Sequence, residues 1–317
     1  MFRRHQKQSG QSVISLKSSR GRQLTATPGR VHLTTDEANP ALETFLDYAD
    51  IHLRSKTNLH ASVLILNADD WGRDHENTQR IYECLRQGTV SSTSAMVFME
   101  DSERAASLAR ENGVDAGLHL NFTTPYTASS CPAGLLEHQR KLASYLNWNA
   151  LAQVVFHPGL VGSFEYVVKA QLHEYGRLYG SSPERIDGHH HMHLCANLVF
   201  AKLLPSGTLV RRNFSFQAGE KSLVNRMYRR ALDGRLVRRH RMVDYLFSLT
   251  PLQPPARLER IRSLAGKCAV EVETHPVNQD EYEFLTGGGA TEWAGDIPIA
   301  ARFALPGLNK LAGKESS

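Results

Sequence analysis

The chain has 317 residues, of which 41% are hydrophobic and 22% charged, a composition typical of an ordinary globular protein. This length allows one large domain or two small ones, and the composition does not suggest a membrane protein. The net charge is +5, but the first 35 residues contain Arg and Lys without any Asp or Glu, so the rest is closer to neutral. The charge therefore does not indicate a nucleic-acid-binding face.

Residues 1–60 differ in composition from the rest of the chain. The first 35 are rich in Ser, Arg, Gln and Thr, which predicts a basic, disordered N-terminal extension. They contain no apolar h-region, which argues against a secretory signal peptide. An organellar transit peptide is the alternative to a plain extension. Residues 40–54 can form one amphipathic helix that leads into the following domain.

From Ser62 onward, predicted strands and helices alternate. The apolar run 63–66 is typical of a buried parallel strand, and a helix over 74–87 ends at Gly88. About seven βα units favour an α/β fold with a mainly parallel sheet, closed or nearly closed as a deformed (β/α) barrel over residues 61–290, with 291–317 as a C-terminal segment. The other predicted strands are 90–98, 116–122, 185–194, 208–215 and 268–274, and the other helices are 102–111, 133–155, 163–179, 196–204, 220–238 and 255–265.

Acidic and imidazole side chains fall near the ends of four predicted strands. Asp69 and Asp70 end the first strand, His119 lies in the third, and the segment from Glu273 to His275 ends the last. A histidine cluster ends another. Each has an ordinary explanation by itself, such as a helix cap, a core histidine or a turn. In βα barrels, however, the carboxyl ends of the strands meet at one mouth, so together they predict an active site.

The histidine cluster spans residues 187–193, with the sequence Asp-Gly-His-His-His-Met-His. On an extended backbone, alternation places Asp187, His189, His191 and His193 on one face and His190 on the other. Clustered imidazoles usually indicate a metal site, whereas a solvated polar loop is the alternative. Cys195 is a further soft-ligand candidate. The four cysteines form no CxxC pair, which favours a reducing cytoplasm.

Four motifs resemble the signatures of the YdjC/ChbG carbohydrate deacetylases. They are 67–72 (NADDWG), 117–120 (GLHL), 187–193 (DGHHHMH) and 273–276 (ETHP), and they occur in the family's order over roughly residues 62–290. The resemblance implies a deformed βα barrel related to the polysaccharide deacetylases. It also implies a divalent metal and removal of an acetyl group from an N-acetylated sugar.

Residue roles follow from the same resemblance. Asp70, His119 and His189 would ligate one divalent metal ion, Asp69 would be the general base and His275 the general acid. Carboxylate and imidazole ligands suit Zn²⁺, Co²⁺ or Mn²⁺, whereas the family is associated with Mg²⁺, so both possibilities stay open.

Five further residues are predicted to bind substrate or to support the ligands. Arg211 is a candidate for an anionic substituent or a plain solvated side chain, and Trp71 stands where Phe is commoner in the family. The set is Asp187, His191, His193, Trp71 and Arg211.

The expected partner is an N-acetylated mono- or oligosaccharide, and the expected location is the cytoplasm. We expect no nucleic-acid or membrane partner. A homodimer is a possible oligomeric state. One alternative function is a catalytically silent sugar-binding or regulatory barrel. Another is a different single-metal hydrolase, such as a phosphoesterase. Asp69 and His275 favour an enzyme, because a binding protein needs neither base nor acid. The sequence shows neither a second carboxylate cluster nor a Gly-rich phosphate loop, which argues against a phosphoesterase.

Overall fold

The protein is described by a computed structural model that covers residues 62–148, 150–217, 219–303 and 305, and three short strands nearer the N-terminus. The chain divides into two compact units, residues 1–49 and 50–317. In the first unit, β1 (Ile14–Lys17), β2 (Gln23–Thr27) and β3 (Arg30–His32) form an antiparallel sheet. We predicted no regular structure there, but apolar and polar residues alternate in β1 as strand pairing requires. The predicted helix over 40–54 lies outside the described residues.

The second unit contains a seven-stranded sheet in the order β8-β7-β6-β5-β4-β10-β9, and every neighbouring pair is parallel. The edge strands approach each other: Leu209 and Arg241 form an isolated parallel bridge, and the Ser215 amide donates to the Leu246 carbonyl at 2.9 Å. The sheet therefore curls into a nearly closed, deformed barrel, which confirms the predicted fold class. Its strands are β4 (Val63–Trp71), β5 (Ser92–Ala95), β6 (Ala116–Leu120), β7 (Arg185–Gly188), β8 (Leu209–Val210), β9 (Tyr245–Ser248) and β10 (Ala269–Thr274).

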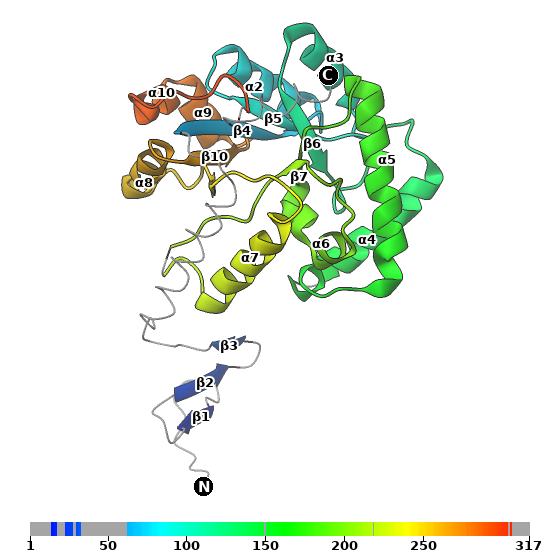
Figure 1. The fold of residues 1–317 in the computed structure, drawn as a ribbon, viewed down its shortest axis with the longest axis vertical. Coiled ribbons are helices and arrows are strands. Elements are labelled where there is room, and N and C mark those ends of the chain that lie inside the picture. Colours follow the sequence, from blue (N-terminus) through cyan, green and yellow to red (C-terminus); the bar gives the residue numbers. More distant parts are fainter. Residues whose placement is uncertain are drawn as a thin grey trace, which may run out of the picture. The chain divides into compact units, whose positions relative to one another are not determined.

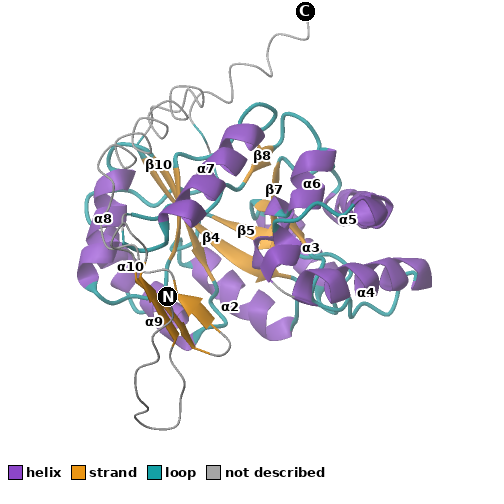
Figure 2. Ribbon diagram, turned by 90° about the horizontal axis from the view of Figure 1, so that it is seen from below, coloured by secondary structure: helices purple, strands orange, loops and turns teal. Residues whose placement is uncertain are grey.

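Helices surround the curled sheet (Figures 1 and 2). Local signals set their ends: the Asp74 carboxylate accepts from the Asn77 amide at 2.8 Å at the start of α2, and Gly180 ends α5 in the left-handed region. The helices are α2 (His75–Arg86), α3 (Ser102–Asn112), α4 (Ala133–Trp148), α5 (Val161–Tyr179), α6 (Ala196–Ala201), α7 (Leu223–Leu236), α8 (Pro255–Ala265), α9 (Gln279–Thr286) and α10 (Gly289–Ala294), with 3₁₀ turns η1 (Ala150–Gln153), η2 (Pro158–Leu160) and η3 (His189–Leu194).

Several predicted boundaries need correction. The predicted helix 133–155 ends at Trp148, and the predicted strand 208–215 is regular only at 209–210. The strand β9 and the helices α9 and α10 were not predicted. The expected boundary at residue 290 falls inside α10.

The two faces of the strands have different surroundings. Leu64, Leu66 and Val272 belong to the main apolar core, which also contains the helical residues Ile81 and Ala105. The alternate positions face the barrel interior. The carboxyl end of this interior is polar and contains buried carboxylates such as Asp69, Asp187 and Glu273. The amino end is apolar and is filled by Ile65, Leu209, Val243, Ala269, Phe303 and Leu305.

A C-terminal segment closes the amino end of the barrel. The Ala300 amide donates to the Leu64 carbonyl at 2.8 Å, and the Phe303 amide donates to the Asp115 carboxylate at 2.8 Å. The Phe303 ring lies 4.5 Å from the Arg185 guanidinium. This segment leaves the opposite end, where the polar side chains gather, uncovered.

Candidate metal centre

A bulge at the end of β4 redirects two adjacent carboxylates. Ala68 pairs with Thr93 but Trp71 pairs with Ala95, so β4 contains one extra residue, and Asp70 has φ 70°. On a regular strand, the adjacent side chains of Asp69 and Asp70 would point to opposite faces. Instead, Asp69 Oδ2 lies 3.9 Å and Asp70 Oδ1 3.5 Å from His119 Nε2. Both carboxylates thus reach the same imidazole.

The histidine cluster does not continue the strand. β7 ends at Gly188, and the chain then turns through η3, where His190 and His191 have left-handed φ angles of 54° and 57°. Gly188 lets the chain turn back closely on itself, because a Cβ there would lie only 3.0 Å from the His193 Cβ and amide nitrogen. The predicted strand over 185–194 is therefore confirmed only over 185–188, and the expected alternation of the histidines is wrong. A strained turn sends the imidazoles in different directions.

The four imidazoles contact four different parts of the barrel. Three contacts come from different strands or from the segments that follow them, and one comes from the loop after β6. They are His189 Nδ1 to Asp70 Oδ1 at 2.9 Å, His190 Nδ1 to Thr123 Oγ1 at 3.0 Å, His191 Nε2 to Glu273 Oε2 at 3.1 Å and His193 Nε2 to the Arg211 carbonyl at 3.0 Å.

Three of the predicted ligands come together. Asp70, His119 and His189 are buried, and one donor atom from each lies within 4.8 Å of the other two. Among the described residues, His119 Nε2 and His189 Nε2 have no partner with hydrogen-bond geometry. Unpaired buried polar atoms are unfavourable unless something else binds them. One carboxylate and two imidazoles facing each other in this way fit a divalent cation.

A buried carboxylate holds the His119 ring in place. Asp187 Oδ1 lies 2.8 Å from His119 Nδ1, and the other Asp187 oxygen accepts from Ser94 Oγ at 2.5 Å. A proton on Nδ1 leaves the Nε2 lone pair directed toward Asp70. The structure thus places Asp187 behind the donor cluster, in a supporting position.

Arg211 links the carboxylates of the barrel interior. Its guanidinium donates to both Asp69 oxygens at 2.6 and 2.8 Å, and to Glu271 Oε1 at 2.7 Å. It also lies 2.9 Å from Asp187 and 3.2 Å from Glu273. The side chain is only 1% exposed. With its donors shared among four carboxylates, Arg211 supports the site and leaves no surface for an anionic substituent of a substrate.

The other two predicted catalytic residues lie beside the donor cluster on neighbouring strands. Asp69 on β4 is fixed by Arg211 and by Asn67 Nδ2 at 2.9 Å. Donor atoms of Asp69, Glu273 and His275 lie within 4.8 Å of one another, and His275 is half-buried, after β10. The proposed base and acid are therefore close together and next to the candidate ligands.

The carboxylates around His119 make its surroundings electrostatically negative. Burial alone would lower the pKa of His119, but the carboxylates of Asp69 and Asp187 outweigh it and raise that pKa to about 10. Burial would raise the pKa of Glu273, yet His191 lowers it to about 2. Burial raises the pKa of Glu271 to about 7 despite Arg211. The same field would stabilise a divalent cation.

Two of the predicted residues lie away from the donor cluster. Trp71 has no exposed surface and belongs to the main apolar core, so it cannot contact a substrate. Cys195 is buried at the start of α6 and joins none of the donor groups among the described residues. Burial raises the pKa of its thiol to about 12, which disfavours the thiolate that a metal would need.

Sequence reasoning missed Glu271 and Arg73. Glu271 lies two residues before the predicted Glu273, on the same strand face, so the period-2 alternation could have found it. Arg73 Nη1 donates to Asp70 Oδ2 at 2.8 Å. No sequence signal distinguished it from a solvated arginine.

An aromatic and basic groove adjoins the cluster beyond His191. The Phe214 ring centroid lies 4.5 Å from that of His191. Phe214 also lines a cavity of about 50 Å³, together with Arg212, Ser215, Phe216, Arg226, Arg229, Arg230, Asp233, Tyr245 and Arg260.

The fold and the cluster together define a class: a (β/α) barrel whose strand ends carry a buried carboxylate–imidazole centre. Within this class, the YdjC-like protein family matches residues 63–294, and the chain belongs to that family. A fold neighbour is a solved structure from Enterococcus faecalis V583, named as a candidate cellobiose-phosphate cleavage protein. It has a TM-score of 0.52 and 20% identity over 75% of this chain and 97% of that one. This likeness concerns the fold alone.

Two relatives carry names that describe an activity. The chain is 34% identical over 135 residues to a chitooligosaccharide deacetylase of Proteus mirabilis, covering 42% of this chain and 51% of that protein. It is 30% identical over 149 residues to a carbohydrate deacetylase of Mus musculus, covering 44% and 46%. The chain thus matches about half the length of these relatives.

Proposed function

We propose that the protein is a metal-dependent hydrolase that removes acetyl groups from N-acetylated mono- or oligosaccharides. The observation that carries this proposal is the meeting of Asp70, His119 and His189 beside Asp69 and His275. The names of the two relatives support the same reaction. None of the described helices is long and apolar enough to cross a membrane.

The donor set fits one divalent ion, Zn²⁺ or Mg²⁺, held by Asp70, His119 and His189. When bound, such an ion polarises a carbonyl oxygen and lowers the pKa of water. The protein itself fixes the orientation of the ligand side chains. Asp187 orients His119, and Arg73 holds the second oxygen of Asp70.

The general base in this proposal is Asp69. Arg211 and Asn67 fix its carboxylate at the mouth of the barrel, where it can accept a proton from an attacking water. Breaking the amide also requires a proton on the departing nitrogen. His275, on the neighbouring strand end, can supply it, because a protonated imidazole can act as a general acid. Glu281 accepts from the His275 amide at 2.6 Å and so positions that residue.

The test is acetate release from a panel of N-acetylated sugars by metal-stripped protein to which single divalent metals are returned. We expect the rate of acetate release to depend on which metal is returned and on the length of the sugar. Activated acetyl esters should be cleaved as well. If no sugar releases acetate with any divalent metal, the silent-barrel alternative replaces this proposal.

A further inference from the structure

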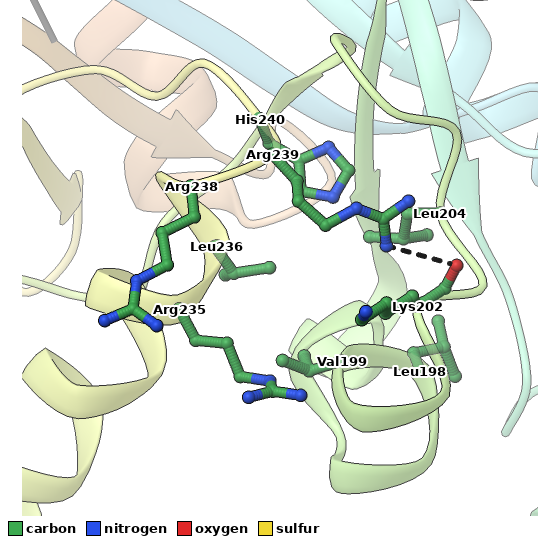
Figure 3. Close-up of a pocket in the computed structure, with 9 residues that line it drawn as sticks. All are labelled: Leu198, Val199, Lys202, Leu204, Arg235, Leu236, Arg238, Arg239 and His240. Carbon is green, nitrogen blue, oxygen red and sulfur yellow. Dashed lines mark hydrogen bonds between the residues drawn. The ribbon is translucent and has the colours of Figure 1, made fainter.

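A second cavity, of about 280 Å³, lies outside the barrel between α6 and the end of α7 (Figure 3). None of the candidate metal ligands lines it, and neither Asp69 nor His275 does. Its walls are Leu198, Val199, Lys202, Leu204, Arg235, Leu236, Arg238, Arg239 and His240.

The charge on the walls has one sign. Lys202, Arg235, Arg238 and Arg239 contribute four cations, and no carboxylate is among the lining residues. Within the described part of the chain, none of the four forms an ion pair. Gathered cations without a counter-charge repel one another, so an anion entering the cavity would be attracted by the three that lie toward α6, Lys202, Arg235 and Arg239 (Figure 3).

Two of these arginines are already positioned. Arg239 Nη1 donates to the Lys202 carbonyl at 3.4 Å, and the Arg235 guanidinium lies 4.7 Å from the centre of the Phe200 ring. Figure 3 shows Arg235 and Arg239 extending from the end of α7 and the residues after it toward α6, with Leu236 between them. Preorganised guanidinium groups lose little freedom when they bind a ligand.

Backbone hydrogen bonds connect residues 239–241, which form one wall of the cavity, to the segment 207–210 that leads into β8. The Gly207 amide donates to the Arg239 carbonyl at 2.8 Å, and the Val210 amide donates to the Arg241 carbonyl at 2.8 Å. His240, between them, is only 7% exposed, and its Nδ1 has no partner among the described residues. A buried polar atom beside a cavity is a group that a ligand or water can satisfy.

The floor of the cavity is apolar. Leu198, Val199, Leu204 and Leu236 are all buried and belong to the apolar cores around α6 and α7. An inorganic ion alone would make no apolar contact with these side chains. The volume is close to the lower end of the range for small-molecule sites, roughly 300 to 1,000 Å³.

We propose that this cavity binds a phosphate group joined to a compact apolar group, with the phosphate against the arginines and the apolar part on the leucine floor. A phosphate monoester carries a charge of about −1.5 to −2 and matches the guanidinium fork. The ligand is a soluble phosphate ester or a phospholipid headgroup. This inference does not depend on the proposed deacetylase function.

The test is calorimetric titration of the full chain with phenyl phosphate, inorganic phosphate and benzyl alcohol, and co-sedimentation with phosphatidylcholine vesicles that contain or lack phosphatidic acid. The key variant is the double substitution Arg235→Gln and Arg239→Gln. A matched control removes two exposed charges from α4, as Arg140→Gln with Lys141→Gln. Titration of the His119→Ala protein reveals any phosphate held at the metal centre.

We expect phenyl phosphate to bind at least tenfold more tightly than inorganic phosphate or benzyl alcohol. The double variant should lose at least tenfold in affinity, whereas the α4 control and His119→Ala should not. Vesicle binding that depends on phosphatidic acid and on both arginines would identify the lipid source. Equal binding by the parent and the double variant, or no binding of phenyl phosphate and vesicles, would overturn the proposal.

Discussion

Arg211 explains how so many carboxylates can lie inside one barrel. Each buried carboxylate is unfavourable unless a cation or hydrogen-bond donors compensate it. One guanidinium contacts Asp69, Asp187, Glu271 and Glu273, but a single positive charge leaves the interior negative overall. The donor cluster of Asp70, His119 and His189 is where the additional positive charge of a metal ion fits.

A first prediction concerns the ligand assignment. His119→Ala removes a buried donor that faces Asp70, so metal content and acetate release should fall together. Elemental analysis of the folded variant measures the metal directly. His173→Ala, an exposed imidazole on α5, serves as the control and should keep both. A folded His119→Ala protein with full metal occupancy would disprove the assignment.

A second prediction separates the proposed base from the ligands. Asp69→Asn keeps the size of the side chain but cannot accept a proton, so acetate release should fall by about 100-fold or more. Metal content should persist, because Asp69 is not a proposed ligand. The exposed Asp296→Asn control should match the parent in both measurements. Deacetylation by Asp69→Asn at the parent rate would contradict the role as base.

The sequence identified the motif residues because acids and imidazoles at strand ends are chemically conspicuous. It could not assign Arg211 or Trp71 correctly. Arg211 looks like any arginine after a strand until three strands bring four carboxylates around it. Trp71 was misplaced because the bulge before it, which turns the ring into the apolar core, leaves no mark in the sequence pattern.

At the scale of elements, the site is built where regular structure stops. The bulge in β4 and the turn after Gly188 both break the period of two that strand prediction assumes. Propensity cannot forecast a left-handed His190 or His191, since the surrounding contacts impose these conformations. Similarly, β9 has only four residues and follows an arginine-rich run, so it gave no clear strand signal.

A third prediction tests α9 as the support of His275. Glu281 is buried and accepts from the Thr250 and Thr274 hydroxyls and from the His275 amide, each at 2.6 Å. Glu281→Gln loses at least one of these charged hydrogen bonds, so the free energy of unfolding should fall by about 1 to 3 kcal/mol. Turnover of amides should fall more than turnover of activated esters, because only amides need a proton on the leaving group.

Denaturant unfolding and paired amide and ester assays measure these effects. Glu292→Gln, an exposed carboxylate on α10, is the control and should behave like the parent. An equal loss on amides and esters would show that Glu281 supports the barrel as a whole and not His275 in particular.

At the scale of the molecule, the alternation of strands and helices was sufficient to predict the fold class. Repeated βα units allow few arrangements other than a parallel sheet covered by helices. The sequence did not predict that residues near the C-terminus close the amino end of the barrel, because Phe303 and Leu305 belong to no regular element. Their burial depends on contacts with strands more than 200 positions away in the chain, such as Ile65.

Two buried groups inside the barrel give folding opposite dependences on pH. Burial lowers the pKa of His193 to about 3, below its ordinary value of about 6.5. The stability from its neutral form is therefore present above pH of about 6.5 and is lost as the pH falls toward about 3. Burial raises the pKa of Glu271 to about 7. Its contribution is present below pH of about 4.5 and is lost as the pH rises through about 7.

A fourth prediction follows for His193→Gln, whose side-chain amide can still donate to the Arg211 carbonyl as His193 Nε2 does. Between about pH 6 and pH 4, the free energy of unfolding should fall with pH more steeply in the parent than in the variant, by about 1.4 kcal/mol per pH unit. The reason is that the variant takes up one proton fewer than the parent when it unfolds. Urea unfolding at a series of pH values measures the two slopes. His173→Gln, an exposed imidazole, should keep the parent's slope. Parallel curves for the parent and His193→Gln would mean that His193 is not held neutral inside the barrel, and the acid sensitivity would then belong to other groups such as His190, whose pKa burial lowers to about 4.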